Sequence, residues 1–165
     1  MPAAVSAVLD GDVAVRMTDA LADVYAEAFA TPPHHEPPGA ADRFRDSLAR
    51  HARLPGFRAA VAWARGADLV GFGYGHTSLP GQWWHDRAAA ALPPEARTWL
   101  DEPFVIVVLA VRPRMRRQGI GGLHGIQSTV VAHELVTVKR AYMESSPSFW
   151  GEVAPVEQDQ GEESW

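Results

Sequence analysis

The residues best suited to chemistry lie together in one stretch, where four arginines are followed closely by three glycines. The arginines are Arg112, Arg114, Arg116 and Arg117, and the glycines are Gly119, Gly121 and Gly122. Glycines leave backbone N–H groups accessible where a strand passes into a helix, and about four such groups are unpaired in a first helical turn. The helix dipole and the arginine charges both favour an anion at that end. The stretch therefore predicts a site for an anion such as a diphosphate.

Two common phosphate motifs do not fit this stretch. A P-loop requires a lysine directly after its last glycine, and the only lysine of the chain is Lys139. The dinucleotide-binding pattern that starts at Gly119 meets His124 where its third glycine belongs. On the glycines alone, a glycine-rich connector with solvated arginines is an equally good interpretation.

The longer stretch LAVRPRMRRQGIGG, residues 109–122, resembles the acetyl-CoA signature of the GCN5-related N-acetyltransferases. In that family a strand ending in Leu-Ala-Val-x-Pro leads to [Arg/Gln]-x-x-Gly-x-[Gly/Ala]. The resemblance covers about residues 10–125, and it implies an N-acetyltransferase that uses acetyl-CoA as its co-substrate. The matching positions are Leu109, Ala110, Val111, Pro113, Arg116, Gly119 and Gly121.

The resemblance assigns the cofactor mainly to the backbone of this stretch. The end of the strand would pair with the pantetheine arm, and the amides of residues 117–122 would hold the diphosphate. An N–H near Leu109 would polarise the thioester carbonyl, as an oxyanion hole does. The implied cofactor-binding residues are Leu109, Ala110, Val111, Arg116, Arg117, Gln118, Gly119, Ile120, Gly121 and Gly122.

The resemblance also implies that the acceptor amine attacks directly, after a base has removed its proton, often through water. The family often carries that base as a glutamate on the signature strand, where this chain has Val105 or Val108. Glu102 is the nearest substitute, and an ordinary loop carboxylate is the alternative. His76 could face the acceptor, but a structural histidine is the commoner case. Tyr142, the only tyrosine after the signature, would protonate the leaving thiolate, although its context differs from that of the family.

Two further motifs have weaker claims to chemistry. Residues 34–36, HHE, lie in a proline-rich loop, and no third ligand stands at a spacing typical of zinc, so we expect no metal. In the family that this chain resembles, the corresponding loop often borders the acceptor pocket. Residues 83–86, WWHD, could line the same pocket or form a partner surface, and one buried tryptophan with the other on the rim is an alternative at least as good.

The elements that position these residues follow from the hydrophobic pattern. We expect an α+β fold with a mixed, largely antiparallel, twisted sheet flanked by helices, which the resemblance identifies as acyl-CoA N-acyltransferase-like and incomplete at its C-terminal end. Thr18 or Asp19 would cap the first helix, and Phe44, Leu48 and His51 would share one face of the second. The expected helices are 16–30, 40–53, 86–100 with an interruption at 93–94, and 119–140; the expected strands are 58–64, 69–78 and 104–111, the last covered on both faces, with a loop at 80–86.

Composition places the chain among globular proteins, with 47% hydrophobic residues and no cysteine over 165 residues. No apolar run approaches the ~20 residues that a membrane helix needs, so we expect a cytoplasmic protein without membrane contact. Residues 1–150 carry equal numbers of acidic and basic side chains, whereas 151–165 are acidic and contain no base. A neutral body argues against a nucleic-acid partner.

The chain reads as a single domain, 1–165, with an atypical C-terminal part. Residues 1–125 are family-like, 126–150 diverge, and 151–165 form an acidic tail expected to be disordered. Three explanations account for this atypical C-terminal part. We favour a replaced or frame-shifted segment. The alternatives are a divergent family member with a shortened sheet, and strands supplied by a partner subunit, as in a homodimer. The expected acceptor is a small-molecule or peptide amine, and the alternative function is an acyl-CoA-binding remnant with impaired catalysis.

Overall fold

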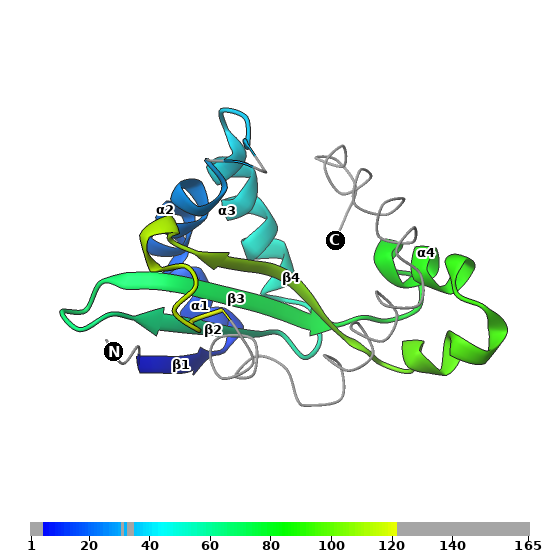
Figure 1. Cartoon of the computed structure of the whole chain (residues 1–165). Helices are drawn as coiled ribbons and strands as arrows, with labels where there is room; N and C mark the ends of the chain where they lie inside the picture. Colours follow the sequence, from blue (N-terminus) through cyan, green and yellow to red (C-terminus); the bar gives the residue numbers. More distant parts are fainter. Residues whose placement is uncertain (1–4, 31, 33–34, 122–165) are drawn as a thin grey trace.

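The computed structural model describes residues 5–30, 32 and 35–121. Its centre is an antiparallel sheet of four strands in the order β1-β2-β3-β4 (Figure 1). Helices flank this sheet, so the α+β class predicted from the sequence is confirmed. Within the described residues every strand pairing is antiparallel. The strands are β1 (Val5–Leu9), β2 (Arg58–Trp63), β3 (Leu69–Thr77) and β4 (Phe104–Val111).

The hairpin β2–β3 and the signature strand β4 form where the sequence predicts them. In the hairpin turn the Ala64 N–H donates to the Asp68 carbonyl at 2.9 Å, and Gly66 has a φ of 106°. Such a positive φ is easy for glycine and strained for other residues. β4 ends two residues before Pro113, which has no N–H to continue a ladder.

The first two elements are absent from the sequence prediction. β1 pairs with β2 along its whole length. Helix α1 (Gly11–Arg16) follows at once, and the Asp10 carboxylate accepts from the Val13 N–H at 2.9 Å as its N-cap. Both elements are short and depend on contacts with distant residues, to which local periodicity is insensitive.

Helices α2 (Thr18–Phe29) and α3 (Ala40–His51) cover one face of the sheet (Figure 1). Both were expected from helical spacing, and both are confirmed with small changes at their ends. Phe44 and Leu48 point into the core as predicted, and the Phe44 ring lies 5.5 Å from the Phe72 ring of β3. His51 shares their face and is buried as well.

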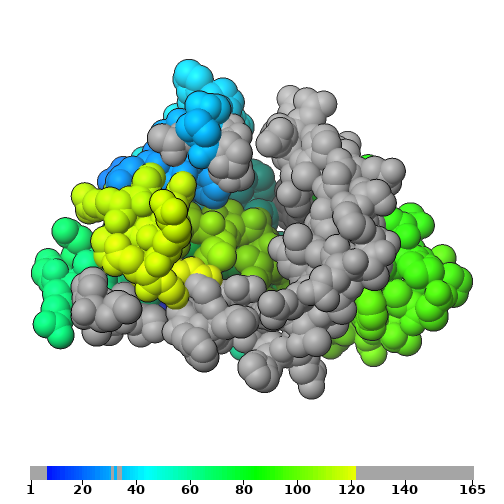
Figure 2. All heavy atoms as spheres, viewed as in Figure 1, coloured from blue at the N-terminus to red at the C-terminus, as the bar shows by residue number. Residues whose placement is uncertain are grey.

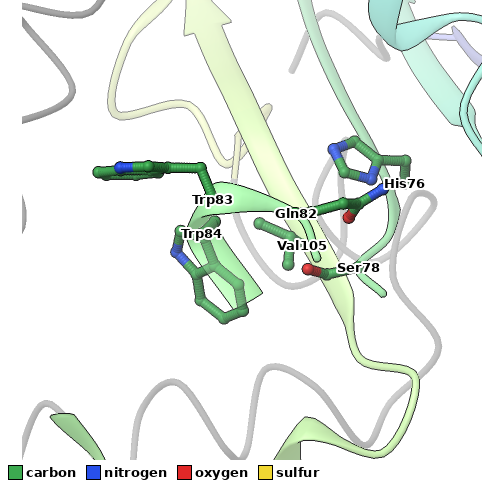
Figure 3. A pocket seen from close by; sticks show the side chains of 6 residues that line it. All are labelled: His76, Ser78, Gln82, Trp83, Trp84 and Val105. Carbon is green, nitrogen blue, oxygen red and sulfur yellow. The ribbon is translucent and has the colours of Figure 1, made fainter. Parts of the chain in front are cut away.

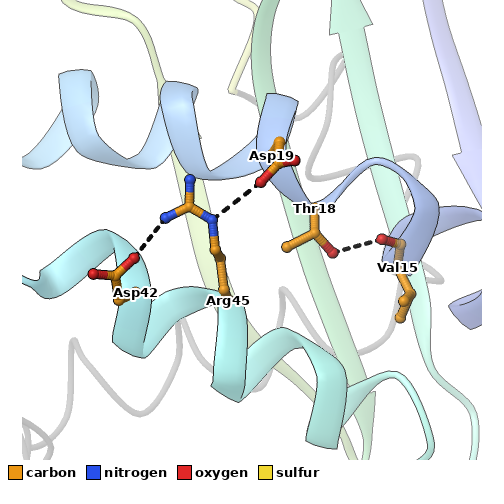
Figure 4. A network of polar contacts seen from close by, with 5 residues as sticks. All are labelled: Val15, Thr18, Asp19, Asp42 and Arg45. Carbon is orange, nitrogen blue, oxygen red and sulfur yellow. Dashed lines mark hydrogen bonds and ion pairs between the residues drawn. The ribbon is translucent and has the colours of Figure 1, made fainter.

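The predicted cap of α2 is wrong. Its N-cap is Met17 rather than Thr18 or Asp19, because α1 ends at Arg16 and leaves a single residue between the helices. The Thr18 hydroxyl instead donates to the Val15 carbonyl at 2.6 Å (Figure 4). The Asp19 carboxylate accepts a hydrogen bond from Arg45 Nε of α3 at 3.2 Å, and Nη1 of the same guanidinium donates to the Asp42 carboxylate at 2.8 Å.

A small lobe lies between β3 and β4 in sequence. It contains α4 (Trp83–Ala91) and the 3-10 helix η1 (Pro94–Leu100), so the predicted interruption at Pro93-Pro94 is confirmed. The lobe has its own apolar cluster, which includes Ala88, Leu92, Ala96 and Leu100. The helix starts three residues before the predicted 86, so the WWHD residues belong to a helix and not to a loop.

β4 differs from its prediction in exposure. A continuous apolar run predicts a strand covered on both faces, but most β4 side chains are only half-buried and Leu109 is 38% exposed. The reason is that β4 is the last strand of the described sheet. The helix predicted over 119–140 has not begun by Gly121, which lies in a turn, and its remainder lies outside the described residues.

Candidate functional site

The pairing of β4 with β3 is interrupted at one residue. Tyr74 lies opposite Val108 and Gly75 lies opposite Ile106, so Val107 is an extra residue in β4. A bulge of this kind bends a strand and increases its local twist. The two halves of β4, the last strand of the described sheet, therefore differ in orientation.

Beyond the bulge, the hydrogen-bond pattern fixes which backbone groups point outward. The Arg112 N–H donates to the Val70 carbonyl at 2.9 Å, which makes these two residues a hydrogen-bonded pair. Because antiparallel pairs alternate, Ala110 directs its N–H and C=O toward β3, whereas Leu109 and Val111 direct theirs away. The outer edge of β4 thus presents N–H groups at two positions to a chain or ligand lying beside it.

A short 3-10 turn, η2 (Pro113–Met115), follows β4 and is held by arginines. Arg112 pairs with Glu27 of α2, and its Nε donates to the Leu69 carbonyl at 2.8 Å. Arg116 donates to the Val111 carbonyl at 3.2 Å and to the Ala28 carbonyl near the end of α2. Two of the four arginines therefore fix the turn against α2 and the sheet.

The predicted cofactor residues come together around one cavity of about 460 Å³. Eight of the ten line it, namely Leu109, Ala110, Val111, Arg116, Arg117, Gly119, Ile120 and Gly121. Gln118 is exposed and its amide donates to the Arg114 carbonyl at 3.3 Å, and Gly122 lies outside the described residues. Figure 2 shows this turn on the surface beside α2, in yellow and blue respectively. The volume lies in the range usual for ligand sites, about 300–1,000 Å³.

Three further residues of this cavity are missing from the sequence prediction. They are Ala28, Phe29 and Met115. Ala28 and Phe29 end α2 and reach the cavity only because that helix packs across β4, so no local motif indicates them. The cavity wall is thus apolar on the α2 side and cationic at Arg116 and Arg117.

Gly119 shows why the turn needs a glycine. Its φ is +80°, and a Cβ at this position would meet no atom within 4 Å. The requirement is therefore conformational rather than steric. Gly121 differs, since a Cβ there would lie in ordinary contact with Val111 at 3.4 Å.

The predicted catalytic residues are not placed at this cavity by the described structure. Glu102 is exposed in the turn before β4, with a φ of +50°, and it does not line this cavity. Tyr142 lies outside the described residues. Val105 and Val108 both lie on β4, and Val105 is opposite His76 of β3.

A second, much smaller cavity lies at the start of β4. Its volume is about 10 Å³, and Figure 3 shows the six residues that line it. His76 is 3% exposed and Ser78 is 1% exposed. Burial lowers the pKa of His76, and a hydrogen bond to Thr77 acts in the opposite direction. The lining residues are His76, Ser78, Gln82, Trp83, Trp84 and Val105.

His35 and Glu36 lie between α2 and α3, His35 is exposed, and His34 lies outside the described residues. No three metal-ligating side chains come together in the part of the chain that the structure describes. None of the described helices has the length and apolar character needed to cross a membrane. WWHD opens α4, and Trp83 and Trp84 line the small cavity.

Comparison with known proteins gives a structural likeness. No family model matches the chain, and no curated protein matches it. Among solved structures, the chain is similar to a GCN5-related glucosamine N-acetyltransferase region of a fungal multi-domain GH3 β-N-acetylglucosaminidase, with a TM-score of 0.46 and 12% identity. The similarity covers 89% of this chain, which spans 17% of the length of that protein.

Proposed function

We propose that this chain binds acetyl-CoA and transfers its acetyl group to a primary amine of a small molecule or peptide. The observation that carries the proposal is the cavity of about 460 Å³, which gathers eight residues that the sequence motif implies for the cofactor. Its residues come from β4, the turn after it and the end of α2. A contiguous motif need not fold around a cavity, so this placement supports the proposal independently of the motif.

The edge of β4 suits the pantetheine arm. Leu109 and Val111 direct their N–H groups away from β3, and an amide-containing arm can pair with such groups as an added strand does. Leu109 is half-exposed, so the arm reaches it without displacing the core. The N–H of Leu109 is then the group that would polarise the thioester carbonyl.

The turn after β4 suits the diphosphate. Arg117, Gly119 and Gly121 line the same cavity, and Gly119 brings backbone close to a ligand without a side chain. Arg117 is exposed at its side chain and adds positive charge. Arg116 contributes charge as well, but its hydrogen bonds to the Val111 and Ala28 carbonyls make it mainly a support of the turn.

The reaction would proceed without a covalent enzyme intermediate. A base takes one proton from the ammonium, and the freed amine nitrogen attacks the thioester carbonyl carbon. The carbon–sulfur bond then breaks, the nitrogen loses its second proton, and the thiolate takes up a proton as CoA leaves. The chain has no cysteine, in keeping with direct transfer. Glu102 as base and Tyr142 as thiolate protonator remain predictions from the sequence, and Glu102→Gln tests the first of them.

A calorimetric titration of acetyl-CoA into the chain tests the proposal. Gly119→Glu puts a carboxylate into the proposed diphosphate site, and Gly81→Glu is a matched control. Both glycines have a positive φ, +80° and +89°, and both have open space around a Cβ, so the two substitutions introduce similar strain and the same charge.

We expect saturable binding in the wild type and in Gly81→Glu, and its loss in Gly119→Glu. Equal binding in all three proteins, or no binding by a folded wild type, would contradict the proposed site. Binding without acetyl transfer to any amine would favour the acyl-CoA-binding remnant over the enzyme. Transfer is followed by thiol release, which is free of background because the chain has no cysteine.

A further inference from the structure

Helix α2 ends with a glutamate that the helix itself does not favour. Glu27 lies in the last turn of α2, and that turn contains no basic residue. A negative side chain at the C-terminal end of a helix is unfavourable, because the helix dipole already places partial negative charge there. The reason for a glutamate at this position therefore has to lie outside the helix.

The partner of Glu27 is Arg112, the residue that directly follows β4. Arg112 Nη1 donates to the Glu27 carboxylate, and Nε of the same guanidinium donates to the Leu69 carbonyl of β3 at 2.8 Å. The backbone N–H of Arg112 donates to the Val70 carbonyl at 2.9 Å. The Arg112 side chain is 19% exposed and that of Glu27 is 38% exposed, so the pair is partly shielded from water. Arg112 is thus fixed to the sheet and holds α2 from there.

A second arginine joins the same end of α2 to the turn after β4. Arg116 donates to the carbonyl of Ala28, and the last four carbonyls of a helix have no partner within it. Arg116 also donates to the Val111 carbonyl at 3.2 Å. Two consecutive residues of α2 are therefore joined to the end of β4 and its turn, Glu27 by its side chain and Ala28 by its backbone.

These links connect two walls of the cavity of about 460 Å³. Ala28 and Phe29 form the wall from α2, and residues of β4 and its turn form the rest. Figure 1 shows the turn after β4 beside α2. Neither Glu27 nor Arg112 lines the cavity, so the pair acts on the placement of its walls and not on a ligand. The width of the cavity consequently depends on where the pair holds α2.

We propose that Glu27 and Arg112 are a positioning pair for the cofactor, whose ion pair holds the end of α2 at the distance from β4 at which both walls contact acetyl-CoA. The inference rests on the proposed binding of acetyl-CoA in this cavity. Without the pair, the end of α2 has to be ordered against β4 each time the ligand binds. That ordering offsets part of the favourable free energy of binding, so affinity falls.

The charges of the pair give a competing explanation that differs in sign. The cavity is proposed to hold a diphosphate, so a nearby negative charge weakens binding and a nearby positive charge strengthens it. If Glu27 acted through its charge alone, Glu27→Ala would leave the positive charge of Arg112 uncompensated and would tighten acetyl-CoA binding. Positioning predicts that the same substitution weakens binding. The direction in which the Kd changes therefore separates the two explanations.

Calorimetric titration of acetyl-CoA into four proteins tests the proposal: the wild type, Glu27→Ala, Arg112→Gln and the double variant. We expect the Kd to rise by about 2- to 30-fold in each single variant, the range that residues supporting a site from outside it usually give. The double variant should bind no more weakly than the weaker single variant, because both substitutions remove the same link. An effect of charge alone would instead make the two single variants change the Kd in opposite directions.

Asp19→Ala is the matched control. Asp19 lies in the first turn of α2, and its carboxylate accepts from Arg45 Nε of α3 at 3.2 Å. Like Glu27→Ala, this variant removes an ion pair between α2 and another element, but at the end of the helix that does not line the cavity. We expect it to bind acetyl-CoA with the wild-type Kd. The melting temperature and the fraction of chains that bind are measured for every protein, because unfolding lowers that fraction without changing the Kd of the folded chains.

A folded wild type that does not bind acetyl-CoA defeats the proposed function itself. If the wild type binds, an unchanged or lower Kd in Glu27→Ala overturns the positioning role alone, and so does an equal rise in Asp19→Ala. A smaller binding fraction with an unchanged Kd would mean that the pair only stabilises the fold, which also overturns the proposal. If Arg112→Gln does not fold, Glu27→Ala still decides the question, because its side chain is partly exposed and alanine favours a helix.

Discussion

His51 offers a quantitative link between burial and stability. It lies on α3 with 2% of its surface exposed, and its Nδ1 is 2.9 Å from the Tyr74 hydroxyl. Burial is the main cause that lowers its pKa from 6.5 to about 4, and the charges of His76 and Arg50 act in the same direction. Protonation of this ring therefore costs more in the folded chain than in the unfolded one.

The sign and size of the effect follow from that difference. The unfolded chain binds the proton more readily, so stability is full above about pH 6.5 and decreases as the pH falls toward 4. The gap between the two pKa values corresponds to about 3 kcal/mol, at about 1.4 kcal/mol per pH unit. About 2 kcal/mol of this is lost between pH 7.5 and pH 5, where few carboxylates have begun to titrate.

Urea unfolding of the wild type and His51→Gln isolates this contribution. Glutamine does not titrate, and its amide, like the imidazole, can hydrogen-bond to a hydroxyl. We expect the free energy of unfolding of the wild type, relative to the variant, to fall by about 2 kcal/mol between pH 7.5 and pH 5. Parallel curves for the two proteins, or an NMR titration that places the His51 pKa near 6.5, would refute the reasoning.

Three further substitutions test the packing. Phe44→Ala should cost about 3–5 kcal/mol in urea unfolding, since the ring is 4% exposed and contacts Tyr25 and Phe72; a cost below about 1 kcal/mol would contradict that core. Gly75→Ala should prevent proper pairing of β3 with β4, because its Cβ would lie 2.1 Å from the Val105 carbonyl oxygen; an unchanged melting temperature would disprove this close contact between the two strands. Arg45→Ala should change the unfolding free energy by less than about 1 kcal/mol, because both its carboxylate partners are exposed, and a larger loss would reveal an unrecognised role.

The elements that the sequence predicts well are those with local signals. β4 is a continuous apolar run stopped by a proline, and the β2–β3 hairpin has a polar, glycine-containing turn between two apolar runs. α2 and α3 show helical spacing of large apolar side chains. β1 and α1 have no such signal, since β1 owes its strand form to pairing with residues fifty or more positions away.

The same distinction between local signals and distant packing applies to the candidate site. The residues from Leu109 to Gly121 are contiguous, so a motif indicates them together. Ala28 and Phe29 reach the cavity only through the packing of α2, which no short pattern encodes. The exposure of β4 likewise depends on its place at the end of the described sheet.

The most direct test of the central claim is amide hydrogen exchange, measured by NMR with and without acetyl-CoA. The proposed site predicts increased protection at Leu109 and Val111 on the edge of β4, and at Gly119 and Gly121 in the turn. The amides of β1, the opposite edge of the described sheet, should exchange at an unchanged rate. Protection elsewhere at saturating acetyl-CoA, or no change at any of these four amides, would contradict a cofactor site at this edge.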